Sequence, residues 1–122
     1  RSYATPANAL LNAGRCSARA GRRDEAADFF RQALSIDPSQ LDAHASLAQL
    51  AFESGDYGRA KTHMLRVLAG NQAAKHDYLM AMAIERKLGD RVAEQSLRQQ
   101  WKKRFSGTGR ESGSSTDDAD ER

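Results

Sequence analysis

Cysteine, proline and aromatic residues are scarce in this chain of 122 residues. Cys16 is the only cysteine, so no disulfide can form within the chain. The only prolines are Pro6 and Pro38, and we expect both to mark helix boundaries. Aromatic residues make up 7% of the sequence, so any core must be built mainly from Ala and Leu. Because Ala, Leu, Arg and Gln are strong helix formers, the composition favours helix throughout.

Long apolar runs are absent as well. No stretch approaches the roughly 18 apolar residues of a membrane-spanning helix. No secretory signal peptide is recognisable either. Since the chain starts abruptly at Arg1, we expect it to be either a mature form or an excised fragment.

Charge is unevenly distributed along the chain. Residues 106–122 contain five acids and two arginines, a net charge of −3, so the +3 of the whole chain leaves +6 for residues 1–105. This mild basic bias is consistent with an acidic partner surface. The chain lacks the clustered Lys/Arg stripe of a nucleic-acid binder, so we expect no nucleic-acid partner. Residues 106–122 hold one apolar residue, Ala119, and are expected to be a disordered Ser/Gly/acidic tail.

A 34-residue interval recurs along the chain. Gly21, Gly55 and Gly89 are spaced 34 residues apart. Further sets keep the same interval: Ala26 and Ala60, Leu34 and Leu68, Asp56 and Asp90, and Leu10, His44 and Tyr78. Thirty-four residues is the period of tetratricopeptide repeats, and other helical repeats differ in length.

The residue types also resemble tetratricopeptide repeats. Ala26-x3-Phe30 followed by Pro38 matches the A-x3-F…P half of the family's motif. The resemblance implies an all-α fold, a right-handed superhelical stack of three helical hairpins over residues 1–105. The repeats would cover about 7–40, 41–74 and 75–105. We expect helices over about 7–20, 24–36, 41–54, 57–69, 75–88 and 91–105.

Several residues are typical of helix ends. The three repeated glycines are expected to end each first helix in the left-handed conformation. Asp24, Asp56 and Asp90 would then lie at the starts of the second helices, where a carboxylate meets the positive end of the helix dipole. Ser39-x-x-Asp42 resembles a capping box for the third helix, with Asp in place of Glu or Gln.

The last repeat departs from the pattern. Glu94 stands where the other repeats have Ala. Leu97, Trp101 and Phe105 recur every four residues, so they share one face of the last helix. We interpret Trp101 and Phe105 as a seal over the end of the core, which terminal repeats need.

A narrower resemblance covers residues 3 to about 105. The segments that carry it are Tyr3-x-x-Pro6, Asn12-Ala13-Gly14-Arg15-Cys16, Ala26-x-x-Phe29-Phe30-Arg31-x-Ala33-Leu34, Ile84-Glu85-x-x-Leu88-Gly89-Asp90 and Lys102-Lys103-Arg104-Phe105. These segments resemble the C-terminal half of PilF/PilW-type type IV pilus biogenesis lipoproteins, the pilotins. The resemblance implies a periplasmic, outer-membrane-associated protein that helps the pilus secretin to localise or assemble. It also implies a lipid anchor, which would lie outside this chain.

In tetratricopeptide proteins the first helix of each hairpin lines a concave groove, where a protein partner would bind. The side chains expected to face it are Asn8, Asn12, Arg15 and Arg19 in the first hairpin, Gln49 and Phe52 in the second, and Met80 and Arg86 in the third. Amides and arginines hold a peptide backbone or a carboxylate with directed donors. Phe52 and Met80 add an adaptable apolar pocket. We therefore predict a groove for an extended or helical peptide from an acidic partner; the alternative is a set of solvated surface side chains.

Signals for metal binding and catalysis are weak. His44 and His63 are expected to approach each other across the second hairpin, yet no His/Cys/carboxylate cluster has zinc spacing. Cys16 is expected to face packing, where a free thiol acts as a small apolar residue, and the sequence offers it no base. We therefore expect no metal, no cofactor and no catalytic residues.

Two functions remain after these exclusions. The first is a non-enzymatic protein–protein interaction scaffold of type IV pilus biogenesis, with the secretin as its partner. The alternative is a generic cytoplasmic tetratricopeptide adaptor that binds an unrelated client peptide. An enzyme is the least favoured class.

Overall fold

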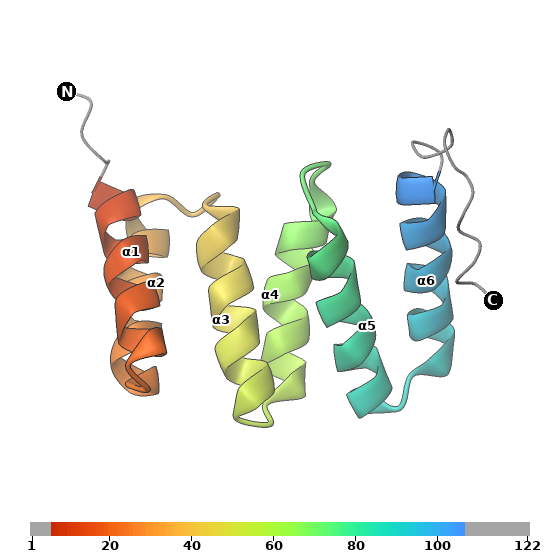
Figure 1. Cartoon of the computed structure of the whole chain (residues 1–122), viewed down its shortest axis with the longest axis horizontal. Coiled ribbons are helices and arrows are strands. Elements are labelled where there is room, and N and C mark those ends of the chain that lie inside the picture. Colours follow the sequence, from red (N-terminus) through yellow and green to blue (C-terminus); the bar gives the residue numbers. More distant parts are fainter. Residues whose placement is uncertain (1–5, 107–122) are drawn as a thin grey trace. The chain divides into compact units, whose positions relative to one another are not determined.

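The computed structural model describes residues 6–106, which form six helices (Figure 1). In chain order they are α1 (Pro6–Arg19), α2 (Arg23–Ile36), α3 (Leu41–Glu53), α4 (Tyr57–Ala69), α5 (Lys75–Leu88) and α6 (Arg91–Ser106). Each expected helix is present, and each end lies within one residue of its expected position. The all-α prediction is confirmed. The expected tail, apart from its first residue, lies outside the described residues.

The described residues form two compact units that divide between Ala73 and Ala74. The first unit contains the hairpins α1–α2 and α3–α4, and the second contains the hairpin α5–α6. The division falls where the 34-residue period separates the second repeat from the third. The arrangement of all three hairpins as one right-handed stack stays a prediction.

A core of apolar side chains joins α1, α2 and α3 in the first unit. Its buried members are Leu11, Ala26, Phe30, Ala33, Ala43 and Leu47. Three of these six residues are alanines and two are leucines, as the composition predicted, and the small alanines allow the helices to approach closely. Phe30 is the largest of these side chains and is 1% exposed. Burial of a side chain of this size contributes about 1.5–3 kcal/mol to stability.

Gly14 allows α1 to pack directly against the ring of Phe30. A Cβ atom at Gly14 would lie 2.5 Å from Cε1 of Phe30 and 2.7 Å from Cδ1. Real Cβ atoms do not approach other heavy atoms this closely, and the Phe30 ring is 1% exposed within a close-packed core. Gly14 is therefore required for packing, not for its backbone freedom.

The turns inside the three hairpins share one geometry. Gly21, Gly55 and Gly89 have φ angles of 82°, 84° and 79°, in the left-handed region that glycine adopts at low cost. In each turn the next residue donates its N–H to a carbonyl five residues earlier: Arg22 to Ser17, Asp56 to Ala51, and Asp90 to Glu85. This bond satisfies a carbonyl at the end of the first helix. The prediction that these glycines end the first helices is confirmed.

The second helices begin with carboxylates, as expected. Asp56 Oδ1 accepts a hydrogen bond from the N–H of Arg59 at 3.2 Å. Asp90 Oδ1 accepts one from the N–H of Ala93 at 2.9 Å. Asp24 lies in the first turn of α2. The carboxylates of Asp56 and Asp90 thus satisfy N–H groups that have no partner inside the helix.

The expected capping box at the start of α3 is wrong. The residue before α3 is Gln40, and its side chain makes no capping hydrogen bond. Ser39 bonds instead to Asp37, whose Oδ1 accepts from the Ser39 N–H at 3.1 Å and from its hydroxyl at 2.7 Å. The Asp37 carboxylate, two residues before Ser39, forms a local turn with it. The Ser39 hydroxyl is used in this turn and therefore does not cap α3.

In the second unit, α5 and α6 pair through charge as well as through apolar contact. Glu94 Oε2 accepts from Arg86 Nε at 3.0 Å and from Arg86 Nη2 at 2.8 Å. The ring of Phe105 lies edge-on to Tyr78, with 5.8 Å between the ring centroids. Trp101 and Phe105 are half-buried, and no residue of α6 is fully buried. Trp101 and Phe105 therefore cover the end of the core only in part within this hairpin.

His44 of α3 and His63 of α4 meet inside the second hairpin, as expected. Their Nδ1 atoms are 3.1 Å apart, and Nε2 of His44 lies 3.1 Å from the carbonyl oxygen of Pro38. Because a carbonyl only accepts, His44 carries its proton on Nε2 and presents an unprotonated Nδ1. His63 therefore donates its Nδ1–H to His44 when both rings are neutral. These two bonds connect α4 through α3 to the loop before α3.

The surroundings of His63 disfavour its charged form. Burial lowers the pKa of the His63 imidazole, and electrostatic repulsion lowers it further; the residues responsible are His44, Arg59, Arg66 and Arg31. Two of the arginines have carboxylate partners, since Arg31 pairs with Asp28 and Arg59 pairs with Asp56. The folded chain therefore resists a proton that the unfolded chain accepts near the ordinary pKa of 6.5.

We expect the free energy of unfolding to decrease as the pH falls below 6.5, because only the unfolded chain then gains a proton readily at His63. Above that pH the ring is neutral in both states, and its contribution is complete. Urea unfolding at pH 7.5 and pH 5.5 measures the change. His63→Gln should reduce the pH dependence, whereas His76→Gln, which removes a side chain that is 82% exposed, should preserve it. Equal pH dependence in wild type and H63Q would contradict this account.

We expect Gly14→Ala to lower the free energy of unfolding by about 1–3 kcal/mol, because overpacking of the Phe30 ring outweighs the gain in helix propensity. Gly58→Ala is the matched control, since Gly58 is also helical and a Cβ there would have nothing within 4 Å. That variant should be as stable as wild type or slightly more so. Phe30→Leu should make Gly14→Ala less damaging, because the smaller side chain leaves room. Urea midpoints that shift equally in both alanine variants would refute the packing argument.

Candidate functional site

A cleft of about 500 Å³ lies between α1 and α3 in the first unit, and we call it the α1–α3 groove. Figure 1 shows these two helices side by side, with α2 behind α1. The lining residues are Arg15, Ala18, Arg19, Gly21, Arg23, Phe30, Ser46, Gln49, Leu50 and Glu53. The structure therefore brings together three of the predicted partner-binding residues, Arg15, Arg19 and Gln49.

The lining of the α1–α3 groove is predominantly basic. Three arginines and one glutamate contribute formal charges of +3 and −1, which leaves +2. The side chains of Arg15 and Arg23 are 44% and 59% exposed, so both guanidinium groups are accessible from solvent. A guanidinium group binds carboxylates through paired N–H donors. The groove is therefore suited to an anionic ligand.

Two ion pairs connect the groove's arginines to α3. Nη2 of Arg15 lies 3.5 Å from Oδ2 of Asp42, and Nη2 of Arg23 lies 3.2 Å from Oε1 of Glu53. Gln49 donates from Nε2 to Oε2 of Glu53 at 2.7 Å. Since these groups are partly exposed, each ion pair contributes little to stability.

Arg23 and Glu53 were not predicted from the sequence. Glu53 follows Gln49 by four residues, so it lies on the same face of α3 and could have been found by helical spacing. Arg23 begins α2, and its place in the groove depends on how the first hairpin packs against α3. No local pattern in the sequence reveals that placement.

Three other predicted residues of the first unit are absent from the groove lining. Asn8 is exposed, and its Oδ1 accepts from Nε2 of Gln40 at 2.8 Å. Asn12 is also exposed on α1. The ring of Phe52 is half-buried and lies edge-on to Tyr57, with 5.4 Å between centroids. The role of these three residues in partner binding stays a prediction.

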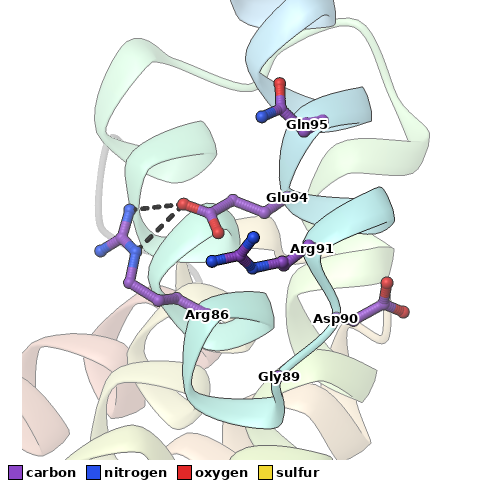
Figure 2. Close-up of a pocket in the computed structure, with 6 residues that line it drawn as sticks. All are labelled: Arg86, Gly89, Asp90, Arg91, Glu94 and Gln95. Carbon is purple, nitrogen blue, oxygen red and sulfur yellow. Dashed lines mark hydrogen bonds and ion pairs between the residues drawn. The ribbon is translucent and has the colours of Figure 1, made fainter.

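The last two predicted residues belong to the second unit. Met80 is half-buried on α5, and Arg86 is exposed. Arg86 lines a separate cleft of about 560 Å³, together with Gly89, Asp90, Arg91, Glu94 and Gln95 (Figure 2). This cleft has two basic and two acidic side chains, and Figure 2 shows Arg86 directed at Glu94. Its charges balance, so it attracts anions less than the α1–α3 groove does.

Cys16 is exposed, so the expectation that it faces packing is wrong. The buried residues of α1 are Ala7, Leu11, Gly14 and Ser17. Cys16 precedes Ser17 and is turned by about 100° from it around the helix, since an α-helix has 3.6 residues per turn. Its Sγ accepts from Nη2 of Arg19 at 3.6 Å.

Within residues 6–106, no three His, Cys, Asp or Glu side chains gather closely enough to hold a metal ion. The His44–His63 contact is accordingly a pair of rings and part of no larger cluster in this range. None of the helices over residues 6–106 combines the length and apolar character needed to cross a membrane.

Comparison with solved structures places the fold among helical-repeat proteins. PilW, a widely conserved type IV pilus biogenesis factor, matches with a TM-score of 0.75 and 27% identity over 85% of this chain and 48% of PilW. This chain therefore spans about half the length of PilW. MamA matches with a TM-score of 0.81 over 92% of this chain and 61% of MamA, but at 13% identity that similarity concerns the fold alone. No curated protein sequence matches the chain.

The family model of the tetratricopeptide repeat matches residues 17–83, which is more than half of the 122 residues. The 34-residue period and the repeated glycine turns agree with this match. Proteins built from such repeats are in general non-enzymatic scaffolds that bind other proteins. The chain belongs to the tetratricopeptide repeat family.

Proposed function

We propose that this chain is a protein–protein interaction scaffold of type IV pilus biogenesis and that its α1–α3 groove binds an acidic segment of a partner protein. The similarity to PilW and the resemblance to pilotins support the process. We further propose that the partner is the pilus secretin and that the protein acts in the periplasm at the outer membrane. These finer assignments rest on the pilotin resemblance.

The charge of the α1–α3 groove is the observation that carries the proposal. Its lining has a formal charge of +2, supplied by exposed arginines on two elements. The cleft of the second unit has a similar volume but balanced charge, so size alone does not distinguish the two. An acidic segment gains charge-assisted hydrogen bonds in the groove, and its attraction to the groove decreases as salt is added.

Affinity copurification tests both the partner and the groove. The tagged chain is recovered from detergent-solubilised envelopes of a piliated bacterium, and bound proteins are identified by mass spectrometry. We expect the secretin to be recovered with wild type and to decrease about tenfold with the double variant Arg15→Ala, Arg19→Ala, because two donors for the ligand are lost. The control double variant Arg91→Ala, Lys102→Ala removes the same charge outside the groove and should retain the secretin.

Each outcome has a distinct meaning. Recovery of unrelated cytoplasmic proteins alone would contradict the pilus assignment and favour the generic adaptor. Recovery of the secretin at equal levels with both double variants would support the process but place the contact outside the α1–α3 groove. Thermal unfolding of each variant shows that any loss of binding does not come from loss of the fold.

A further inference from the structure

The three arginines of the α1–α3 groove differ in the groups of the chain that they already contact. Arg15 pairs with Asp42, and Arg23 pairs with Glu53. Within residues 6–106, the guanidinium of Arg19 contacts the sulfur of Cys16 and forms no ion pair with a carboxylate. A ligand carboxylate can therefore bind Arg19 without displacing an internal one, whereas it must compete for the other two.

Glu53 is a carboxylate of the chain itself that two donors of the α1–α3 groove already hold. One of its oxygens lies 3.2 Å from Nη2 of Arg23, and the other accepts from Nε2 of Gln49 at 2.7 Å. A guanidinium and an amide thus hold the two oxygens of one carboxylate. The Glu53 side chain is 37% exposed, so water can replace it when it moves away.

We propose that Glu53 is an internal competitor for the ligand and that it makes the α1–α3 groove selective for segments with at least two acidic side chains. This inference rests on the proposed function of the groove. One ligand carboxylate binds Arg19, and a second displaces Glu53 from Arg23 and Gln49. A segment with a single acid binds Arg19 alone and leaves Glu53 in place.

The spacing along α1 indicates which acidic segments fit. Arg15 and Arg19 are one helical turn apart, about 6 Å along the helix axis. In an extended peptide, alternate side chains lie on the same side and are about 6.6 Å apart. An extended stretch with acidic residues at alternate positions matches the spacing of Arg15 and Arg19, so this pattern is used in the probe below. The site at Arg23 and Gln49, where the second carboxylate displaces Glu53, lies on α2 and α3, so the spacing along α1 does not set its distance from Arg19.

A peptide titration of the full chain tests this competition. The probe is a fluorescein-labelled peptide of sequence Gly-Asp-Ser-Asp-Ser-Asp-Gly, and fluorescence anisotropy at low salt measures its affinity. We expect Glu53→Gln to bind it about three- to tenfold more tightly, since one exposed ion pair no longer competes. A peptide with a single Asp should bind wild type more weakly and gain less than the probe from E53Q.

Asp28→Asn is the matched control. Asp28 also pairs with an arginine on the surface, Arg31 at 2.8 Å, but it lies outside the groove lining. It removes the same charge as E53Q, so it should leave the affinity near the wild-type value. Asp42 also lies outside the groove lining, but it pairs with Arg15 of that lining, so Asp42→Asn releases a groove arginine and should also bind more tightly.

The outcomes separate this inference from the proposed function. If the probe binds wild type, is lost with Arg19→Ala, and binds E53Q no more tightly than D28N, then the groove function stands and the competition is refuted. If the probe binds none of these proteins, both are refuted. Tighter binding by E53Q and D42N than by D28N supports the inference.

Discussion

The contact between Gly14 and the Phe30 ring determines how closely α1 and α2 pack, and the α1–α3 groove depends on that packing. A Cβ at Gly14 would lie 2.5 Å from the ring, so the present separation exists only with glycine. Phe30 belongs to the buried core and also lines the groove. With Gly14 turned toward α2, Arg15 and Arg19 lie on the part of α1 that faces the groove. Gly14 thus allows α1 and α2 to pack closely and also positions the surface that we propose for binding.

In the first unit, the residues that stabilise the fold differ from those that we propose to bind a partner. The core consists of alanine, leucine and phenylalanine side chains that are almost fully buried. The groove's charged groups are exposed, and their ion pairs to Asp42 and Glu53 contribute little to folding. Changes in these charges can therefore alter affinity while the fold persists. The His44–His63 contact in the second hairpin is unlike these exposed ion pairs. It is part-buried, so protonation of His63 changes the free energy of unfolding directly.

The 34-residue period predicted the helices well because each turn inside a hairpin needs a residue at positive φ. The sequence shows a glycine at each of these positions. The capping box at Ser39 failed because Asp37 is a nearer acceptor for the same hydroxyl. Arg15, Arg19 and Gln49 were predicted from the face of a helix that they occupy. Arg23 was missed because its place depends on how hairpins pack, and the fit of Phe52 against Tyr57 likewise depends on contacts that spacing alone does not specify.

The central claim is that the α1–α3 groove binds an acidic segment, while the surface of α4 does not. Amide hydrogen exchange followed by mass spectrometry tests it most directly, with the full chain measured alone and with a saturating acidic partner peptide. The account predicts slower exchange in the peptides that cover the C-terminal turns of α1 and α3, including Arg19 and Glu53. Slower exchange confined to α4 around His63, with α1 and α3 unchanged, would contradict it.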